Sequence, residues 1–239
     1  MKALPSAAGG DRAARPDRIL DAAADSLVRW GYPRVTVDDV AAQADVGTGT
    51  LYLHWPTKAA LFESVLLREL YAIWAELADR LRNRPAEAAP HRLLVALLRA
   101  VRERPLARAL FARDAAVLGK LARSTAATAS GAFPETVAFL GAFRAVGLVR
   151  ADVDPAAQAY AFGAVWTGFV LVDGFLAPGD RPPLGVELDA LAQTVRGAFE
   201  PDVLPDAAAL RDVAAPRVIA LLEAVCAEVA RQLAGRRLA

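Results

Sequence analysis

Apolar residues recur at helical spacing along almost the whole chain. Ile19, Leu27 and Trp30 fall on one face of a helix, and the same three- and four-residue steps return after Thr57. We find no convincing run of the alternating apolar and polar residues that a half-buried strand requires. The sequence therefore predicts an all-α fold whose helical stretches, separated by glycine and proline, are 16–30, 36–44, 48–54, 57–82, 90–103, 105–122, 132–146, 155–177, 185–200 and 207–235.

Composition sets limits on location and on partners. The 239 residues suffice for one small and one larger domain, and the formal net charge of +1 provides no global field to attract a polyanion. The single cysteine, Cys226, cannot form an internal disulfide, and the first ten residues lack the charged start and apolar core of a signal peptide. We therefore expect a cytoplasmic protein.

Two short predicted helices meet at a tight turn near residue 45. Thr36 can cap the first helix, and Asp39 can reach back to it from the third helical position. Residues 45–47 form a turn, and the second helix runs from about Thr48 until Pro56 stops the segment that contains it. This is the arrangement of a helix-turn-helix unit, whose second helix enters the major groove of DNA.

The second short helix begins with small residues. In the stretch VGTGTLYLHWPTK, residues 46–58, the glycines leave room for the backbone to approach DNA, and free amide groups can meet phosphate. Threonine hydroxyls and methyls can contact base edges, and Tyr52 and His54 can donate to phosphate. Lys58 is the one fixed cation, whereas Trp55 is expected in the core.

The stretch TVDDVAAQADVGTGTLYLHWPTKAALF, residues 36–62, resembles without gaps the DNA-binding domain of the tetracycline-repressor (TetR) family of bacterial transcription regulators. The likeness extends more loosely from about residue 15. It implies a homodimer that binds a palindromic operator in double-stranded DNA. It also implies base or groove contacts by Thr48, Gly49, Thr50 and Leu53, and phosphate contacts by Thr36, Tyr52, His54 and Lys58, and we add Arg15 and Gly47 to the expected DNA-binding set.

The resemblance also divides the chain. We expect a flexible arm over residues 1–14, a three-helix helix-turn-helix domain over 15–60, and a helical effector-binding and dimerisation domain over 61–239. Residues 1–60 carry seven Lys or Arg and seven Asp, so the local charge sum is zero. This is a weak footprint for a DNA-binding protein, and we expect Arg12, Arg15 and Lys58 to face DNA.

Two positions depart from the family pattern. Asp45 stands where glycine is usual, and Gly47 replaces a usual serine or similar cap. Aspartate tolerates a left-handed backbone and glycine is an acceptable N-cap, so each change is expected to cost about 1 kcal/mol or less.

Residues 155–172, PAAQAYAFGAVWTGFVLV, form an uncharged stretch that by length alone could span a membrane. Its flanks carry aspartates instead of Lys or Arg, and Gly163 and Gly168 suit close helix contact. We therefore expect a helix buried on both sides and no membrane span, and the family resemblance implies that this helix pairs two subunits. The stretches 185–200 and 207–235 remain the other candidates for the dimer interface.

Aromatic side chains in the larger domain predict a pocket for a small, largely apolar ligand, although plain core packing is the alternative for each of them. Asp173 interrupts an apolar run and would need a partner if buried, either an arginine across a subunit boundary or a ligand. His91 follows Pro90 at a helix start and is expected to be solvated. The candidate pocket residues are Tyr71, Trp74, Phe111, Phe139, Phe143, Tyr160, Trp166, Phe169 and Asp173.

These features predict a transcriptional repressor that a small molecule releases from its operator. One alternative is a DNA-binding regulator without a small-molecule ligand, and another is a helical enzyme. The sequence contains no Gly-x-Ser-x-Gly elbow, phosphate loop or metal-ligand cluster. We therefore expect no catalytic residue, no metal and no cofactor.

Overall fold

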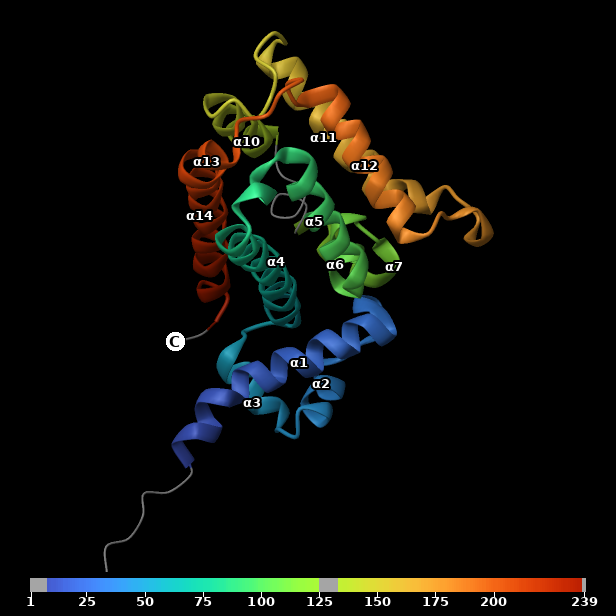
Figure 1. Ribbon diagram of the computed structural model, residues 1–239. Coiled ribbons are helices and arrows are strands. Elements are labelled where there is room, and N and C mark those ends of the chain that lie inside the picture. Colours follow the sequence, from blue (N-terminus) through green and yellow to red (C-terminus); the bar gives the residue numbers. More distant parts are fainter. Residues whose placement is uncertain (1–7, 125–132, 238–239) are drawn as a thin grey trace, which may run out of the picture.

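The computed structural model describes residues 8–124 and 133–237, and over these ranges the chain is helical with no strand, which confirms the all-α prediction. The first three helices lie together at one end of the molecule, with α2 and α3 beneath α1 on the side away from the larger domain (Figure 1). They are α1 (Ala8–Arg34), α2 (Val37–Gln43) and α3 (Thr48–His54).

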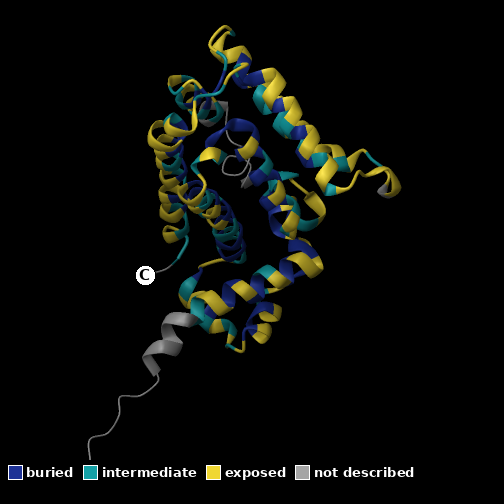
Figure 2. Ribbon diagram, viewed as in Figure 1, coloured by how far each residue is buried: buried dark blue, intermediate teal, exposed yellow. Residues whose placement is uncertain are grey.

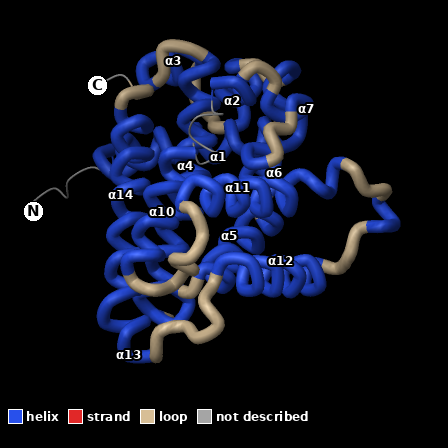
Figure 3. The backbone as a smooth tube through the Cα atoms, turned by 90° about the horizontal axis from the view of Figure 1, so that it is seen from above, coloured by secondary structure: helices blue, strands red, loops and turns tan. Residues whose placement is uncertain are grey.

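The larger domain is built around α4 (Lys58–Asn83), which packs along α14, while α5 packs against α12 and α10 against α11 (Figures 1 and 3). A short turn of 3-10 helix over Pro85–Ala88 leads from α4 into α5. The other helices are α5 (Pro90–Glu103), α6 (Pro105–Phe111), α7 (Ala115–Leu118), α8 (Leu121–Ser124), α10 (Phe133–Ala145), α11 (Pro155–Leu171), α12 (Leu184–Phe199), α13 (Ala207–Ala209) and α14 (Ala215–Ala234).

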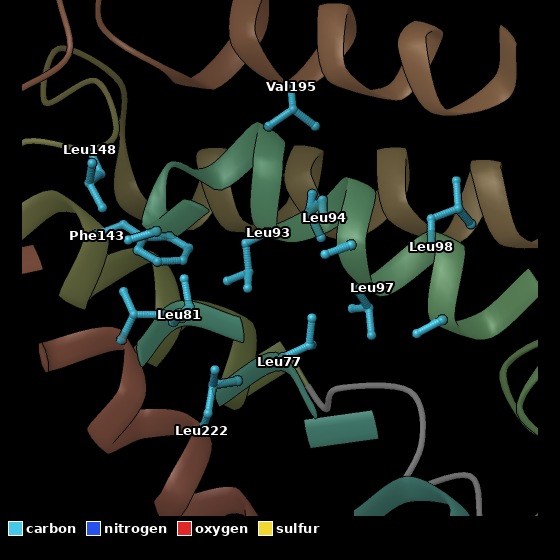
Figure 4. Packing of buried hydrophobic residues seen from close by; sticks show 14 of the residues in the cluster. Leu77, Leu81, Leu93, Leu94, Leu97, Leu98, Phe143, Leu148, Val195 and Leu222 are labelled. Atoms are coloured by element: carbon cyan, nitrogen blue, oxygen red, sulfur yellow. The ribbon is translucent and has the colours of Figure 1, made fainter. Parts of the chain in front are cut away.

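Two hydrophobic cores share α4. The first half of this helix, up to Leu70, packs with α1, α2, α3 and α6, and the second half, from Ile73, packs with α5, α10, α12 and α14. Figure 4 shows Leu77 and Leu81 of α4 directed toward leucines of α5 and toward Leu222 of α14. Trp74 packs against both cores. The helix therefore joins the two domains through continuous packing.

Two predicted helices have different bounds in the structure. Helix α1 begins at Ala8, so residues 8–14 of the predicted arm are helical, because Pro16 removes only one helical hydrogen bond and the chain before it can continue the helix. The stretch 105–122 forms α6, α7 and the start of α8, since Arg113 and Gly119 take positive φ angles of 53° and Asp114 caps α7. The stretch 207–235 is helical as predicted and contains a π-helical turn over Leu210–Ala214. Residues 1–7 of the predicted arm lie outside the described residues.

Helix α11 is not buried on both sides, which corrects the prediction. Within the described residues, Pro155–Gly174 is long and apolar enough to cross a membrane by length and composition, and 17% of its most apolar window is buried. Tyr160 is 73% exposed, and exposed positions continue along α11 and α12 (Figure 2). The prediction failed because one chain supplies packing partners for a single side of this helix.

His91 is buried, whereas the sequence predicted a solvated side chain. Its Nδ1 lies 2.8 Å from both carboxylate oxygens of Glu200, and its backbone N–H donates to the same carboxylate at 2.7 Å. A guanidinium nitrogen of Arg196 lies 2.9 Å from Nε2. Because arginine only donates, this contact assigns Nε2 as acceptor and the proton to Nδ1, which donates to Glu200. The partners lie more than a hundred residues away in sequence, so local pattern did not reveal them.

Gly31 provides a stability test at the contact between the two domains. It has φ 71° and ψ 156°, and a Cβ built there would lie 2.6 Å from the carbonyl oxygen of Ala116. We expect Gly31→Ala to lower the free energy of unfolding by at least about 1–3 kcal/mol, the usual cost of such a backbone conformation for a non-glycine residue. Gly197→Ala in α12, where a Cβ meets open space, should be neutral or stabilising. Equal denaturation midpoints for wild type and Gly31→Ala would contradict this expectation.

Candidate DNA-binding surface and ligand cavity

Helix α2 begins with the predicted reciprocal cap. The backbone N–H of Asp39 donates to the Thr36 hydroxyl oxygen at 3.1 Å, and the backbone N–H of Thr36 donates to the Asp39 carboxylate at 2.8 Å. The Thr36 hydroxyl also donates to this carboxylate at 2.6 Å, and this hydrogen bond, followed by the one from the Thr36 backbone N–H, lowers the pKa of Asp39. The carboxylate is therefore charged at neutral pH and the cap is complete. The cap positions the start of α2 at the molecular surface.

The turn between α2 and α3 tolerates both departures from the family pattern. Asp45 takes φ 53°, the left-handed conformation that aspartate accepts, and the N–H of Val46 returns to the carbonyl of Ala41 at 3.0 Å. Gly47 is the N-cap of α3 with an extended backbone and no side-chain cap. The geometry of a helix-turn-helix unit is therefore retained.

One face of α3 is anchored in the core and the other is open. Leu51 and Trp55 are buried, and the indole N–H of Trp55 donates to the Ser64 hydroxyl at 2.9 Å, which confirms Trp55 as a core residue. On the outer face, Tyr52 is 47% and Leu53 71% exposed. A Cβ added to Gly49 meets no atom within 4 Å. The packed face fixes the helix, so its outer face is presented as a rigid surface.

A carboxylate that sequence reasoning missed lies beside this surface. The Thr48 hydroxyl donates to Asp38 of α2 at 2.7 Å, and both groups are exposed. The hydroxyl of Thr48 therefore has a protein partner, while its methyl group remains available. No sequence pattern indicates this contact, because it depends on the angle between two short helices.

The remaining predicted DNA-binding residues lie in or next to the same unit. Thr50 and His54 are partly exposed on α3, and the His54 ring packs at 5.6 Å from that of Trp55. Lys58 begins α4, where its ammonium group donates to the carbonyl oxygen of Tyr32 at 2.8 Å. Arg15 lies apart from them in sequence, partly buried on α1.

A cavity of about 1080 Å³ lies in the larger domain among α4, α5, α10, α11 and α14. Six of the nine predicted pocket residues line it, namely Trp74, Phe111, Phe139, Phe143, Tyr160 and Trp166. Phe162 and Phe175 also line the cavity, but the sequence analysis did not predict this. Their position on or just after the apolar helix α11 could have indicated it. The rings of Phe111 and Trp166 meet edge to face at 6.0 Å. The cavity is therefore largely aromatic and apolar.

The other three predicted pocket residues do not line the cavity. Tyr71 is 42% exposed on the outside of α4, and Phe169 packs against the core while its carbonyl accepts from Arg102 at 2.7 Å. Asp173 lies 3.3 Å from the same Arg102, which also pairs with Glu187. The partner of Asp173 is therefore an arginine of the same chain, and not an arginine of another subunit or a ligand, as predicted. Arg102 reaches Asp173 because α5 runs beside the end of α11 in the folded domain.

The charge of the cavity lining limits what it can bind. Glu228 is the single charged side chain among the lining residues that the structure describes, and it pairs with Arg231. The amide of Gln232 donates to the same carboxylate at 2.8 Å. An anionic ligand would find no cation in this lining, whereas an uncharged apolar ligand would be favoured.

The fold and this surface define the class of protein, a helix-turn-helix protein with a separate cavity domain. Residues 19–65 match the family described as "Bacterial regulatory proteins, tetR family". Over these residues the chain is similar to the DNA-binding domain of TetR-family regulators.

Curated relatives match part of the chain. It is 35% identical over 94 residues to the uncharacterized HTH-type transcriptional regulator Rv2250c of Mycobacterium tuberculosis, which is 39% of this chain and 46% of that protein. It is 44% identical over 59 residues to the HTH-type transcriptional repressor KstR of Rhodococcus jostii, which is 25% of this chain and 28% of that repressor. The chain thus spans less than half the length of these relatives.

Solved structures extend the similarity to most of the fold. The reduced form of NemR from Escherichia coli superposes with a TM-score of 0.56 and 16% identity, covering 80% of this chain and 99% of NemR. The fatty acid degradation regulator FadR of Bacillus halodurans superposes with a TM-score of 0.52 and 17% identity, covering 82% of this chain and 97% of FadR. At this level of identity the likeness concerns the fold.

Proposed function

We propose that this protein is a cytoplasmic, homodimeric transcriptional repressor that a small, uncharged, apolar molecule releases from a palindromic operator. The observation that carries the proposal is the outer face of α3, where Gly49, Tyr52 and Leu53 are exposed on a helix anchored by Leu51 and Trp55. A short rigid helix with small and mixed residues at its open face fits the major groove.

In this proposal, the base contacts depend on the shape of the outer face of α3. The open space at Gly49 allows the backbone of α3 to come close to the bases, and the exposed Leu53 can contact thymine methyl groups. Tyr52 and Thr36 would donate to phosphates, which fix the register without specifying sequence. We keep His54 and Lys58 in the proposed set as phosphate contacts and Thr50 as a base or groove contact.

Dimerisation through α11 accounts for its exposed apolar side chains. Tyr160 and Leu171 of α11 are 73% and 36% exposed, and Val172 and Phe175, which follow the helix, are 39% and 86% exposed. All four also line the cavity, so the proposed interface would lie next to it. In contrast, α14 packs against α4 and exposes charged residues such as Glu223 and Arg231. An apolar surface of this kind is typical of a subunit interface. We therefore favour α11 over 207–235 as the centre of the dimer interface.

The cavity is placed to transmit ligand binding to the DNA-binding domain. Trp74 and Phe111 line it and also pack against both hydrophobic cores. A ligand that binds better to one position of these rings would favour the corresponding orientation of α4 and α6. In a dimer, a change in α4 alters the separation of the two α3 helices and thus the fit to successive major grooves.

The DNA-binding proposal predicts that the operator is symmetric and that a larger side chain in place of Gly49 weakens binding. Selection from a random duplex library should recover a two-fold symmetric sequence with half-sites about one helical turn apart. Gly49→Leu should lower affinity for that duplex at least about tenfold, since each lost base contact costs about 1–3 kcal/mol. Gly141→Leu in α10, also exposed and with open space, is the matched control. If both variants bind like wild type in a fluorescence anisotropy titration, α3 is not the recognition helix.

The dimer proposal predicts that charge on α11 separates the subunits. Tyr160→Glu places a carboxylate in the proposed interface and should shift the sedimentation coefficient from dimer to monomer at micromolar concentration. Val203→Glu, at an 83% exposed position after α12, should leave the dimer intact. A Tyr160→Glu variant that sediments as a dimer would exclude α11 from the interface.

The ligand proposal can be tested with a thermal-shift screen of uncharged apolar compounds. A compound that occupies the cavity should raise the melting temperature, by mass action on the folded state, and weaken DNA binding. Trp166→Ala removes one wall of the cavity and should weaken binding of that compound about tenfold. Stabilisation without any effect on DNA affinity would favour a regulator without a small-molecule effector, and tighter DNA binding would indicate a corepressor.

A further inference from the structure

The chain contains three lysines, Lys2, Lys58 and Lys120, and two of them meet at one aromatic ring. The ammonium nitrogen of Lys58 lies 4.5 Å from the centroid of the Tyr32 ring, and that of Lys120 lies 5.9 Å from the same point. Lys58 begins α4 beside the helix-turn-helix unit, whereas Lys120 lies between α7 and α8 of the larger domain. One cation from each domain therefore lies near the Tyr32 ring.

The local backbone allows this approach. Gly119 takes φ 53°, and a Cβ added there would lie 3.3 Å from the ring of Tyr32 and 3.2 Å from Pro33. A side chain at this position would separate the segment from the ring. Lys120 itself is exposed, so its position depends on this close backbone contact and on the attraction between a cation and an aromatic face.

Neither ammonium group has an ion pair with a carboxylate in the ranges that the structure describes. Asp39 is engaged in the cap of α2, and Glu63, the acidic group that acts on Tyr32, pairs with Arg236 at 2.8 Å. Burial lowers the pKa of Lys58, and the charge of Lys120 lowers it further. Two like charges near one ring form a site that a bound anion would stabilise.

We propose that Lys58 and Lys120 together bind one phosphate group of the operator backbone, so that the larger domain itself contacts DNA through Lys120. This inference rests on the proposed DNA-binding function. The location favours duplex phosphate over a free anion, because Tyr32 lies four residues before Thr36 and the exposed Arg34 lies between them. The added cation also compensates for the zero charge sum of residues 1–60.

Lys120 also lies close in sequence to the ligand cavity. Phe111, at the end of α6, lines the cavity, and α6 and α7 both contact α1. A ligand that moves Phe111 would thus shift the segment that holds Lys120 against Tyr32. The proposed phosphate contact would then be present in one state of the protein and weakened in the other.

The test is the salt dependence of DNA affinity. Lys120→Gln, Lys120→Arg and the control Arg217→Gln, which changes an exposed cation at the start of α14, would be titrated with the duplex selected by wild type at about 50–200 mM salt. Lys120→Gln removes one contact per subunit, so the log–log slope should fall by about two per dimer and affinity about three- to thirtyfold. Lys120→Arg should retain most of the slope, and Arg217→Gln should match wild type.

Two results would contradict this proposal, and a third would contradict the proposed DNA-binding function on which it rests. A Lys120→Gln slope equal to that of Arg217→Gln would overturn the contact while leaving DNA binding by α3 intact. If inorganic phosphate raises the melting temperature of wild type but not of Lys120→Gln, and the slope is unchanged, the pair is a free-anion site and the DNA assignment is wrong. If wild type selects no duplex, it is the proposed function that fails, independently of Lys120.

Discussion

The rest of the structure depends on the packing of α4, whose buried face belongs to two hydrophobic cores. Its first half holds α1, α2 and α3 together, and its second half carries the helices around the cavity. Protein interiors are close-packed, so a change on one half is felt on the other. Trp74 and Phe111 lie where the two cores meet and also line the cavity. In the proposed function, this shared packing couples the cavity to the DNA-binding domain.

Charge is distributed differently in the two parts of the molecule. Residues 1–60 carry no net charge, and the outer face of α3 presents small and apolar groups. In the larger domain many arginines are engaged in ion pairs, as Arg102 is with Asp173 and Glu187. A cation without a carboxylate partner therefore keeps its charge available for an external anion. The pair at Tyr32 is one such place, and there the larger domain approaches the proposed DNA-binding surface.

Local signals predicted local structure well. The Thr36 cap, the left-handed Asp45 and the N-cap Gly47 are confirmed, because each depends on residues within a few positions of one another. Six cavity residues were predicted from their apolar helices. The buried His91 and the intrachain partner of Asp173 were missed, since each depends on a contact with a distant segment. The DNA-binding, dimer and ligand assignments remain predictions.

The sequence by itself determined the helices, the helix-turn-helix unit and the aromatic character of the larger domain, because hydrophobic periodicity, caps and turn residues act over one or two helical turns. Tertiary structure alone decided which face of α11 stays uncovered, where the cavity lies and which groups meet at Tyr32. Those features depend on how helices far apart in the chain pack together. Such packing is set by the shape complementarity of whole surfaces, which no short stretch of sequence contains.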